Sequence, residues 1–244
     1  FLEKAFSDTE RGLIVSDKSL DYVMYTLISG IIGARIYYVI FEWDYYIMYP
    51  SEIYKIWHGG LAIHGGILAG AITIIVYCKK YNADIKKIFD IIAPGLIIAQ
   101  AIGRWGNFFN GEAFGSAVSY QTLANMKFVP QFVIDNMYIN GSYHLPMFYF
   151  ESIVCVVGFI ILLLIRRAKY IKKGQVSGFY FIWYGAFRIA IEVFRTDSLM
   201  MFGVKTAYLA CGLMIFIGIY LIASQARKPK LDDLYNSFDE IIKY

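Results

Sequence analysis

The residues with the most chemistry to offer are charged side chains inside otherwise apolar segments. Arg104 lies in the run GRWGNFFNGE at 103–112, and Arg188, Glu192 and Arg195 follow one another at i, i+4 and i+7. This spacing places the last three on one face of a helix, where Glu192 can bridge both guanidiniums. Because a charge inside a bilayer costs at least about 2.5 kcal/mol, each of them needs a partner or a task.

Two amides extend the polar strip that begins at Arg104. Asn107 and Asn110 stand at i+3 and i+6 from this arginine and can act as hydrogen-bond donors. Guanidiniums bind phosphate groups through paired, charge-assisted hydrogen bonds. The strip therefore suits a phosphate ester presented by a lipid head group.

The same charges also allow structural interpretations. Arg188 and Glu192 can form a neutralised pair that fixes helix packing. His64 can be a hydrogen-bonded core histidine, although Gly65 and Gly66 beside it leave room for a ligand. The sequence leaves these alternatives open.

Arg35 is a further charge in the middle of an apolar segment, and Glu151 begins another such segment. The arginine can extend its stem so that the guanidinium reaches the membrane interface. Alternatively, it can pair with Glu42 or with Glu151.

The elements that must position these residues are transmembrane helices. Of the 244 residues, 58% are hydrophobic and 17% are charged, and the mean hydropathy is +0.51, which is too apolar for an ordinary soluble domain. A spanning helix needs about 20 apolar residues. We therefore predict an all-α, polytopic integral membrane protein with about six spans. They lie at 22–41, 60–78, 88–108, 146–165, 176–194 and 206–224.

Lysines and arginines predict the orientation of these spans. They gather in the connections at 79–87, 166–173 and 227–230, which share one side if six spans alternate. Basic connections are typical of the cytoplasmic side, so the C-terminus is expected there. Arg104 and Arg195 then fall near the outer ends of their spans. Both can converge on one anionic group, which predicts a site toward the outer face.

The domain organisation follows from the same pattern. We expect a polar N-terminal segment at 1–21, a transmembrane catalytic domain at 22–224 and a cytoplasmic tail at 225–244. The long outer connection at 110–145 is rich in aromatic residues, which favours a cap that faces lipid. Gly66 and Gly70 have the small-xxx-small spacing that lets helices approach closely.

We expect neither a metal nor a cofactor. The three histidines form no HxxxH or HExxH pattern, and the three cysteines have no CxxC spacing and are typical of small apolar fillers. The basic residues lie beside apolar segments and form no continuous stripe, so nucleic acid is not an expected partner. Membrane lipid is the expected partner instead.

The run GRWGNFFNGEAFG at 103–115 resembles the signature of the prolipoprotein diacylglyceryl transferase family, G-R-x-G-N-F-x-N-G-E-x-x-G. Four further blocks match that family in order, and the resemblance covers about 21–224. The blocks are GARIYYV at 33–39, GGLAIHGG at 59–66, PMFYFES at 146–152 and the stretch 188–197.

This resemblance implies an enzyme of the bacterial cytoplasmic membrane. It would transfer the diacylglyceryl group of phosphatidylglycerol to the lipobox cysteine thiol in the signal peptide of a preprolipoprotein, releasing glycerol phosphate. That reaction is the first step of bacterial lipoprotein maturation. Because the nucleophile belongs to the substrate, the enzyme needs no catalytic serine or cysteine of its own.

The resemblance also assigns roles to residues. Arg104 and Arg195 would bind and stabilise the phosphate, and His64 is the candidate base, since a neutral imidazole can accept a thiol proton. The asparagines would orient the head group, while Glu112 and Gly115 would shape the loop. The expected substrate-binding residues are Arg35, Asn107, Asn110, Glu112, Gly115, Glu151, Tyr184, Arg188 and Glu192.

The sequence departs from the family pattern in two places. Family members carry one more span, with an H-W-Y-G type motif, before the region at 21, which makes seven spans. This chain begins after it, at Phe1, which implies a truncated and inactive fragment. In the block at 146–152, Phe150 replaces the usual tyrosine, so a hydroxyl there must come from Tyr149.

Two other function classes are compatible with buried charges. A transporter or channel would use them to line a solute path, but it would be expected to show inverted repeats or paired broken helices, and neither pattern occurs. A phosphatase or phosphatidyltransferase acting on an anionic lipid would need acidic metal motifs of the DxxD kind. Such carboxylate clusters do not occur within the predicted spans.

Overall fold

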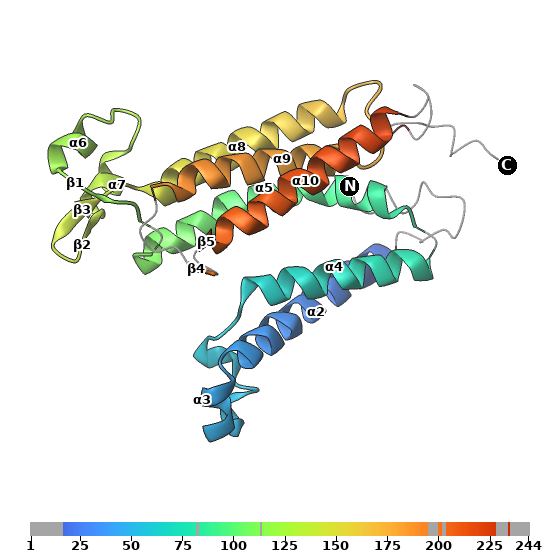
Figure 1. Cartoon of the computed structure of the whole chain (residues 1–244), viewed down its shortest axis with the longest axis horizontal. Helices are drawn as coiled ribbons and strands as arrows, with labels where there is room; N and C mark the ends of the chain where they lie inside the picture. Colours follow the sequence, from blue (N-terminus) through green and yellow to red (C-terminus); the bar gives the residue numbers. More distant parts are fainter. Residues whose placement is uncertain are drawn as a thin grey trace. The chain divides into compact units, whose positions relative to one another are not determined.

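Long helices form most of the structure, a computed structural model that describes residues 17–81, 83–112, 114–194, 200–201, 204–227 and 234. Each of the six predicted spans lies on one of these helices, with ends that differ by a few residues. The helices are α2 (Asp17–Phe41), α4 (Ile63–Lys80), α5 (Ile85–Asn110), α8 (Met147–Arg166), α9 (Gln175–Glu192) and α10 (Thr206–Ala226) (Figure 1).

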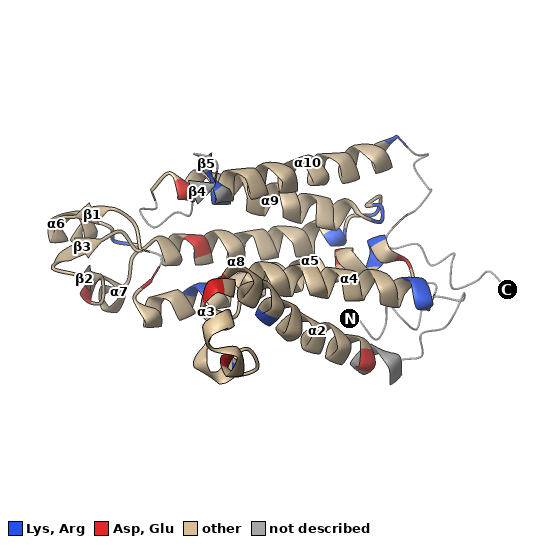
Figure 2. Ribbon diagram, turned by 60° about the horizontal axis from the view of Figure 1, so that its bottom comes forward, with Lys and Arg blue, Asp and Glu red and all other residues tan. Residues whose placement is uncertain are grey.

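The helices have the character of a multi-pass membrane protein. By length and composition, α2, α4, α8 and α10 can each cross a membrane. Most of each long ribbon carries no charged residue (Figure 2). The other two long helices, α5 and α9, carry buried charges. The all-α membrane fold is confirmed, while the count of six spans stays a prediction.

Internal contacts divide the chain into two compact units, with the boundary between Ile88 and Phe89. The first unit contains α2 and α4, joined by α3 (Trp43–Met48) and the 3₁₀ helices η1 (Pro50–Glu52) and η2 (Ile56–His58). The second contains most of α5 together with α8, α9 and α10. The predicted division into an N-terminal segment, one catalytic domain and a tail stays a prediction.

Glycine lets α2 and α4 approach closely in the first unit. A Cβ added to Gly66 would lie 3.2 Å from the carbonyl oxygen of Gly30, and one added to Gly33 would lie 2.7 Å from that of Gly65. A Cβ on Gly70 would be in ordinary contact with Thr26. The small-residue spacing noted in the sequence therefore marks a real helix interface.

The second unit is a helix bundle with an apolar core. Residues of α5, α8 and α9, such as Ile97, Leu162 and Val176, are fully buried against one another. Helices α9 and α10 also pack through glycine, since a Cβ on Gly218 would lie 2.6 Å from the carbonyl oxygen of Gly178. This packing fixes the distances between side chains on α5, α8 and α9.

A buried aspartate joins α5 to the start of α9. Asp90 is 0% exposed, and its carboxylate accepts hydrogen bonds from the backbone N–H of Gly174 at 2.6 Å and of Ser177 at 2.8 Å. The Ser177 hydroxyl also donates to it at 2.7 Å. A carboxylate at a helix N-terminus satisfies N–H groups that the helix leaves unpaired. Asp90 therefore holds α9 in register against α5.

Two lysines of the predicted basic connections are buried. Lys172 and Lys173 are each less than one-tenth exposed, and the ammonium of Lys172 donates to the carbonyl oxygen of Gln225 at 3.0 Å. Lys172 therefore ties the connection before α9 to the end of α10. The orientation of the chain, with the basic connections on the cytoplasmic side, stays a prediction.

The long connection at 110–145 folds into a small subdomain. It contains β1 (Ala117–Val118), α6 (Tyr120–Ala124), α7 (Gln131–Asp135), β2 (Tyr138–Ile139) and β3 (Ser142–His144). The strands form an antiparallel sheet in the order β1-β3-β2, with Ala117 opposite His144. Leu123 and Val133 of this subdomain are buried together with Phe148 of α8. The sequence did not reveal these strands, which are two or three residues long.

Candidate active site

Four charged side chains from three helices meet inside the second unit. Glu151 of α8 lies between two arginines: its Oε2 is 2.5 Å from Nε of Arg104 on α5, and its Oε1 is 3.5 Å from Nη1 of Arg188 on α9. The same Nη1 is 2.7 Å from Oε2 of Glu192. That last contact is an ion pair without hydrogen-bond geometry. We call these four residues the charge cluster.

The charge cluster is buried and balanced. Glu151 is 4% exposed and Glu192 is 2% exposed, while both arginines are largely covered. Two positive and two negative groups cancel. Removing one partner from such a set leaves an uncompensated buried charge, which is strongly destabilising. An arriving anion that binds the guanidiniums must therefore change the pairing of the glutamates.

An aromatic and amide layer lies beside the cluster. The Tyr184 hydroxyl accepts a hydrogen bond from Nη2 of Arg104 at 3.4 Å, and its ring stacks on that of Tyr180. Tyr180 in turn accepts from the amide nitrogen of Gln100 at 3.0 Å. Among the described residues, the amide oxygen of Gln100 has no hydrogen-bond partner. The polar strip on α5 thus extends one turn from Arg104 toward the N-terminus of the helix.

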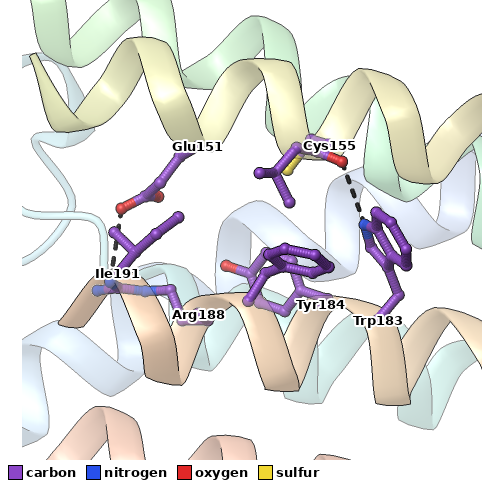
Figure 3. A pocket seen from close by; sticks show the side chains of 8 residues that line it. Glu151, Cys155, Trp183, Tyr184, Arg188 and Ile191 are labelled. Atoms are coloured by element: carbon purple, nitrogen blue, oxygen red, sulfur yellow. Dashed lines mark hydrogen bonds and ion pairs between the residues drawn. The ribbon is translucent and has the colours of Figure 1, made fainter. Parts of the chain in front are cut away.

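A pocket opens between α8 and α9 at the cluster (Figure 3). Glu151, Tyr184 and Arg188 form its polar lining. The rest of the lining is apolar or aromatic and consists of Val154, Cys155, Trp183, Phe187 and Ile191. The lining therefore places charged groups next to apolar and aromatic side chains.

Arg35 occupies a different environment in the first unit. It is 7% exposed, and all five of its N–H donors reach backbone carbonyl oxygens in the connection between α3 and α4. The guanidinium also lies 5.3 Å from the ring centre of Tyr46. Within the first unit, the partners of the guanidinium are these carbonyls rather than Glu42, and a pairing with Glu151 stays a prediction. The accepting carbonyls belong to Glu52 at 2.6 Å, Ile53 at 2.8 Å, Lys55 at 3.4 Å, Gly59 at 2.7 Å and Gly60 at 2.8 Å.

His64 lies in the first turn of α4 and is exposed rather than part of a core. Its ring is 6.2 Å from the ring of Tyr37. The backbone before it is fixed to α2, because the N–H of Ala62 donates to the carbonyl oxygen of Ala34 at 3.0 Å. The interpretation of His64 as a buried core histidine was wrong, and its role as a base stays a prediction.

The comparisons with known proteins decide the family. A family model described as prolipoprotein diacylglyceryl transferase matches residues 3–224. The chain belongs to this family.

Curated relatives agree with that assignment. A phosphatidylglycerol–prolipoprotein diacylglyceryl transferase of Lactobacillus delbrueckii subsp. bulgaricus is 45% identical over 225 residues, covering 91% of this chain and 81% of the relative. Proteins with the same name in Streptococcus agalactiae and Streptococcus pyogenes are each 44% identical. They cover 93% and 88% of this chain, and the alignments span 87% and 82% of the respective relatives.

The family signature at 103–115 spans the end of α5 and the entry to the small subdomain. Asn107 is half-buried on α5, and its carbonyl oxygen accepts from the N–H of Glu112 at 2.9 Å. Asn110 is the last residue of α5 and is exposed, as is Glu112. The expectation that these residues contact substrate stays a prediction.

Gly115 ends the signature at a close approach of chain segments. Its N–H donates to the carbonyl oxygen of Leu145 at 2.9 Å, and its carbonyl oxygen is 2.9 Å from Nδ1 of His144. A Cβ here would lie 2.8 Å from Cγ of Met147 and 2.9 Å from Cβ of Leu145. A side chain here would therefore require Met147 and Leu145 to shift, and the role of Gly115 in shaping the loop stays a prediction.

Arg195, the second arginine expected at the phosphate, lies outside the described residues, so its bridge to Glu192 stays a prediction. The hydroxyl of Tyr149, considered as a substitute for the tyrosine missing at Phe150, donates to the carbonyl oxygen of Phe128 at 2.9 Å. It therefore holds the small subdomain against α8.

The bridge that Glu151 forms between Arg104 and Arg188 was not predicted. One signal was present, since α5, α8 and α9 each carry charges in apolar surroundings and their signs cancel as a set. Gln100 and Tyr180 were not predicted. Placing an uncharged amide or a tyrosine in a spanning helix costs less free energy than placing a charge there, so neither residue requires a partner.

Proposed function

We propose that this protein transfers the diacylglyceryl group of phosphatidylglycerol to the cysteine thiol of a prolipoprotein, the first step of bacterial lipoprotein maturation. Membership of the family carries the proposal, and the charge cluster supplies a fitting site. Two guanidiniums held in an apolar interior can bind the oxygens of a phosphodiester.

The reaction needs no covalent bond between enzyme and substrate, because the nucleophile and the leaving group both belong to the substrates. The thiol of the lipobox cysteine attacks the terminal glycerol carbon of the diacylglyceryl group. The bond between that carbon and the phosphate oxygen breaks, and glycerol phosphate leaves. Negative charge therefore grows on the phosphate, and fixed cations that face it in a dry site lower the barrier.

Arg104 and Arg188 are the cations that the geometry supports best. Both are paired with carboxylates, and a phosphodiester offers similar oxygens in a similar arrangement. Binding can therefore proceed by exchange, in which the phosphate replaces Glu151 at one or both guanidiniums. Tyr184 can follow Arg104 to the phosphate as a further donor.

The remaining family residues complete the assignment. Arg195 joins the phosphate-binding group, Asn107 and Asn110 orient the glycerol head group, and Glu112 and Gly115 shape the loop over it. The protein lies in the bacterial cytoplasmic membrane with the site toward the outer face and the C-terminus in the cytoplasm. This placement follows the distribution of basic residues along the sequence.

The decisive experiment supplies both substrates. Membranes that contain the protein are incubated with a lipobox peptide and either phosphatidylglycerol or phosphatidylethanolamine. The mass of the peptide is then measured by mass spectrometry. We expect a diacylglyceryl mass increase with phosphatidylglycerol alone. A peptide with serine in place of the cysteine serves as the control. An unmodified cysteine peptide in the presence of phosphatidylglycerol would overturn the proposal.

A further inference from the structure

We propose that Ser152 is a positioning residue for the transfer reaction, because its hydroxyl fixes the helical turn that carries Arg104. The inference rests on the proposed function and deepens it by naming what aligns one of the phosphate-binding arginines. Ser152 directly follows Glu151 on α8, and its partner Trp105 directly follows Arg104 on α5. Trp105 fills a variable position of the family signature, so the signature itself gives this residue no role.

The Ser152 hydroxyl contacts both ends of one turn of α5. It donates a hydrogen bond to the carbonyl oxygen of Ala101 at 3.0 Å and accepts one from Nε1 of Trp105 at 3.2 Å. A hydroxyl can donate once and accept as well, so it can make both bonds together. In an α-helix, the carbonyl of Ala101 is also the acceptor for the backbone N–H four residues later, that of Trp105. The hydroxyl therefore bridges the turn at 101–105, which contains Arg104.

This bridge is buried, and the indole is also held from its other side. Ser152 is 6% exposed and Ala101 is 2% exposed. A buried polar group that loses its hydrogen-bond partner costs free energy, so the three groups stay together. The Trp105 ring stacks on Phe132 of α7, with ring centres 6.2 Å apart, and packs edge-on against Phe148 at 5.5 Å. The direction of the indole N–H, toward Ser152, is therefore fixed.

The residues next to the bridge are two that meet at the site. Nε of Arg104 lies 2.5 Å from Oε2 of Glu151. Because each of these residues precedes one end of the bridge in the sequence, the bridge sets the separation of the backbones that present them. Serine hydroxyls join membrane helices at many places where no chemistry occurs. The bridge formed by Ser152 differs in that it acts on a turn with a phosphate-binding side chain.

Catalysis makes the position of this turn decisive. In the exchange proposed for binding, the phosphate replaces Glu151 at Arg104, and the ion pair then no longer holds the guanidinium. The position of Arg104 then depends on the turn from which its side chain starts. A misplacement of about 1 Å can lower a rate by on the order of 10²-fold, because a fixed cation must face the charge that develops on the phosphate. Ser152 therefore acts on the rate through Arg104.

The test measures steady-state kinetics of the full chain in membranes, with phosphatidylglycerol and the lipobox peptide as substrates. We expect Ser152→Ala to lower kcat per folded protein by about tenfold. The KM for phosphatidylglycerol should change by less than about threefold, because a bound phosphate can shift with the guanidinium, whereas the transition state cannot. Ser152→Thr keeps a hydroxyl and should retain most of the wild-type kcat. Equal losses in the two variants overturn the inference, and so does an unchanged kcat in Ser152→Ala.

An Arg104→Lys background distinguishes positioning from packing. The paired contact that Ser152 is proposed to align is already lost in this background. Adding Ser152→Ala should therefore lower the remaining kcat by less than about twofold. If Ser152 only packs α8 against α5, the tenfold loss will recur in this background, and that outcome overturns the inference.

Ser29→Ala is the matched control, because the Ser29 hydroxyl also joins two long helices. It accepts a hydrogen bond from the Thr73 hydroxyl of α4 at 2.7 Å, in the first unit. Its loss should lower the thermal stability but leave kcat per folded protein unchanged. A tenfold loss of kcat in this variant would show that any missing interhelical hydroxyl slows the enzyme, and it would overturn the inference.

Trp105→Phe covers the case in which Ser152→Ala fails to accumulate in the membrane. It removes the indole N–H but keeps an aromatic ring beside Phe132 and Phe148, so kcat should again fall, and fall no further in the Arg104→Lys background. An unchanged kcat in Trp105→Phe overturns the inference. A wild-type protein that forms no product with phosphatidylglycerol is a distinct result, because it contradicts the proposed function itself.

Discussion

Buried arginines in the two units of this protein have opposite kinds of partner. In the first unit, Arg35 donates all five N–H groups to backbone carbonyls of the connection that leads into α4. In the second unit, Arg104 and Arg188 pair with the carboxylates of Glu151 and Glu192. A guanidinium filled by carbonyls has no donor left for a ligand, whereas one paired with a carboxylate can exchange it for a phosphate.

The comparison separates two uses of the same side chain in an apolar interior. Carbonyl oxygens are neutral and fixed by the backbone, so Arg35 acts as a permanent clip for the segment at 52–60. Carboxylates are mobile and charged, so the pairs in the cluster keep the arginines in place until an anion arrives. Arg35 was expected among the substrate-binding residues, and its environment instead favours a structural role.

The largest effect is expected from the cluster arginines. Arg104→Ala and Arg188→Ala should each lower kcat/KM with phosphatidylglycerol by about 10²–10³-fold, because each removes a fixed cation from the developing charge. The lysine variants should recover only part of the loss, since an ammonium cannot make the paired contact. Product formation by mass spectrometry measures this. Full activity of both lysine variants would contradict bidentate phosphate binding by these arginines.

A different outcome is expected for Arg35. Arg35→Ala leaves five partly buried carbonyls without their charged donor, so the free energy of unfolding should fall by on the order of 3 kcal/mol. Thermal unfolding in detergent measures the loss. The Kd for phosphatidylglycerol of the folded fraction should not change. A weakened Kd with unchanged unfolding would reverse the roles of the two arginine environments.

Two neighbouring glycines sharpen the comparison. Gly59 and Gly60 both have positive φ, at 88° and 76°, so alanine is strained at either position. A Cβ on Gly60 would also lie 2.5 Å from Nη1 of Arg35, while nothing lies within 4 Å of one on Gly59. Gly60→Ala should therefore destabilise more than Gly59→Ala, by about 1–2 kcal/mol.

The double variant of Gly60→Ala with Arg35→Ala provides the control for this difference. If the alanine acts by displacing the guanidinium, the two changes should be clearly less than additive in thermal unfolding. Additive losses of stability would show that Gly60 and Arg35 act independently and that Gly60→Ala does not destabilise the protein by displacing the guanidinium.

The smallest effect concerns the surface of the clipped segment. Lys55 at 2.7 Å, and then His58 at 2.8 Å, hold the pKa of the Glu52 carboxyl below its ordinary value of 4.5. The stabilisation is therefore present above pH 4.5 and is lost as the pH falls through the lowered pKa. The melting temperature should drop slightly more on acidification in the wild type than in Glu52→Gln. Equal decreases in the melting temperature of both proteins would show that the Glu52 interactions do not stabilise the fold.

The fold class could be predicted from the sequence because the bilayer imposes a simple rule. About 20 apolar residues are needed per span, and the six segments found in this way all lie on long helices. The small subdomain at 110–145 could not be predicted in the same way. Its strands are two or three residues long, and long-range pairs such as Ala117 with His144 leave no local periodicity.

The candidate site was predicted in part. The cost of burying charge identified Arg104, Arg188, Glu192 and Glu151 as residues that need partners, and the structure joins these four. The partners themselves could not be predicted, because Arg104 and Glu151 are 47 residues apart and meet only through the packing of α5 on α8. For Arg35, the sequence suggested carboxylate partners, whereas the structure supplies carbonyls.

Binding of a short-chain phosphatidylglycerol to purified protein in detergent tests whether the cluster arginines, and not Arg35, hold the phosphate. We expect Arg104→Ala or Arg188→Ala to weaken the Kd by at least about tenfold, equivalent to about 1.4 kcal/mol, while folded Arg35→Ala binds as the wild type does. Unchanged binding in both cluster variants, with lost binding in Arg35→Ala, would contradict this expectation.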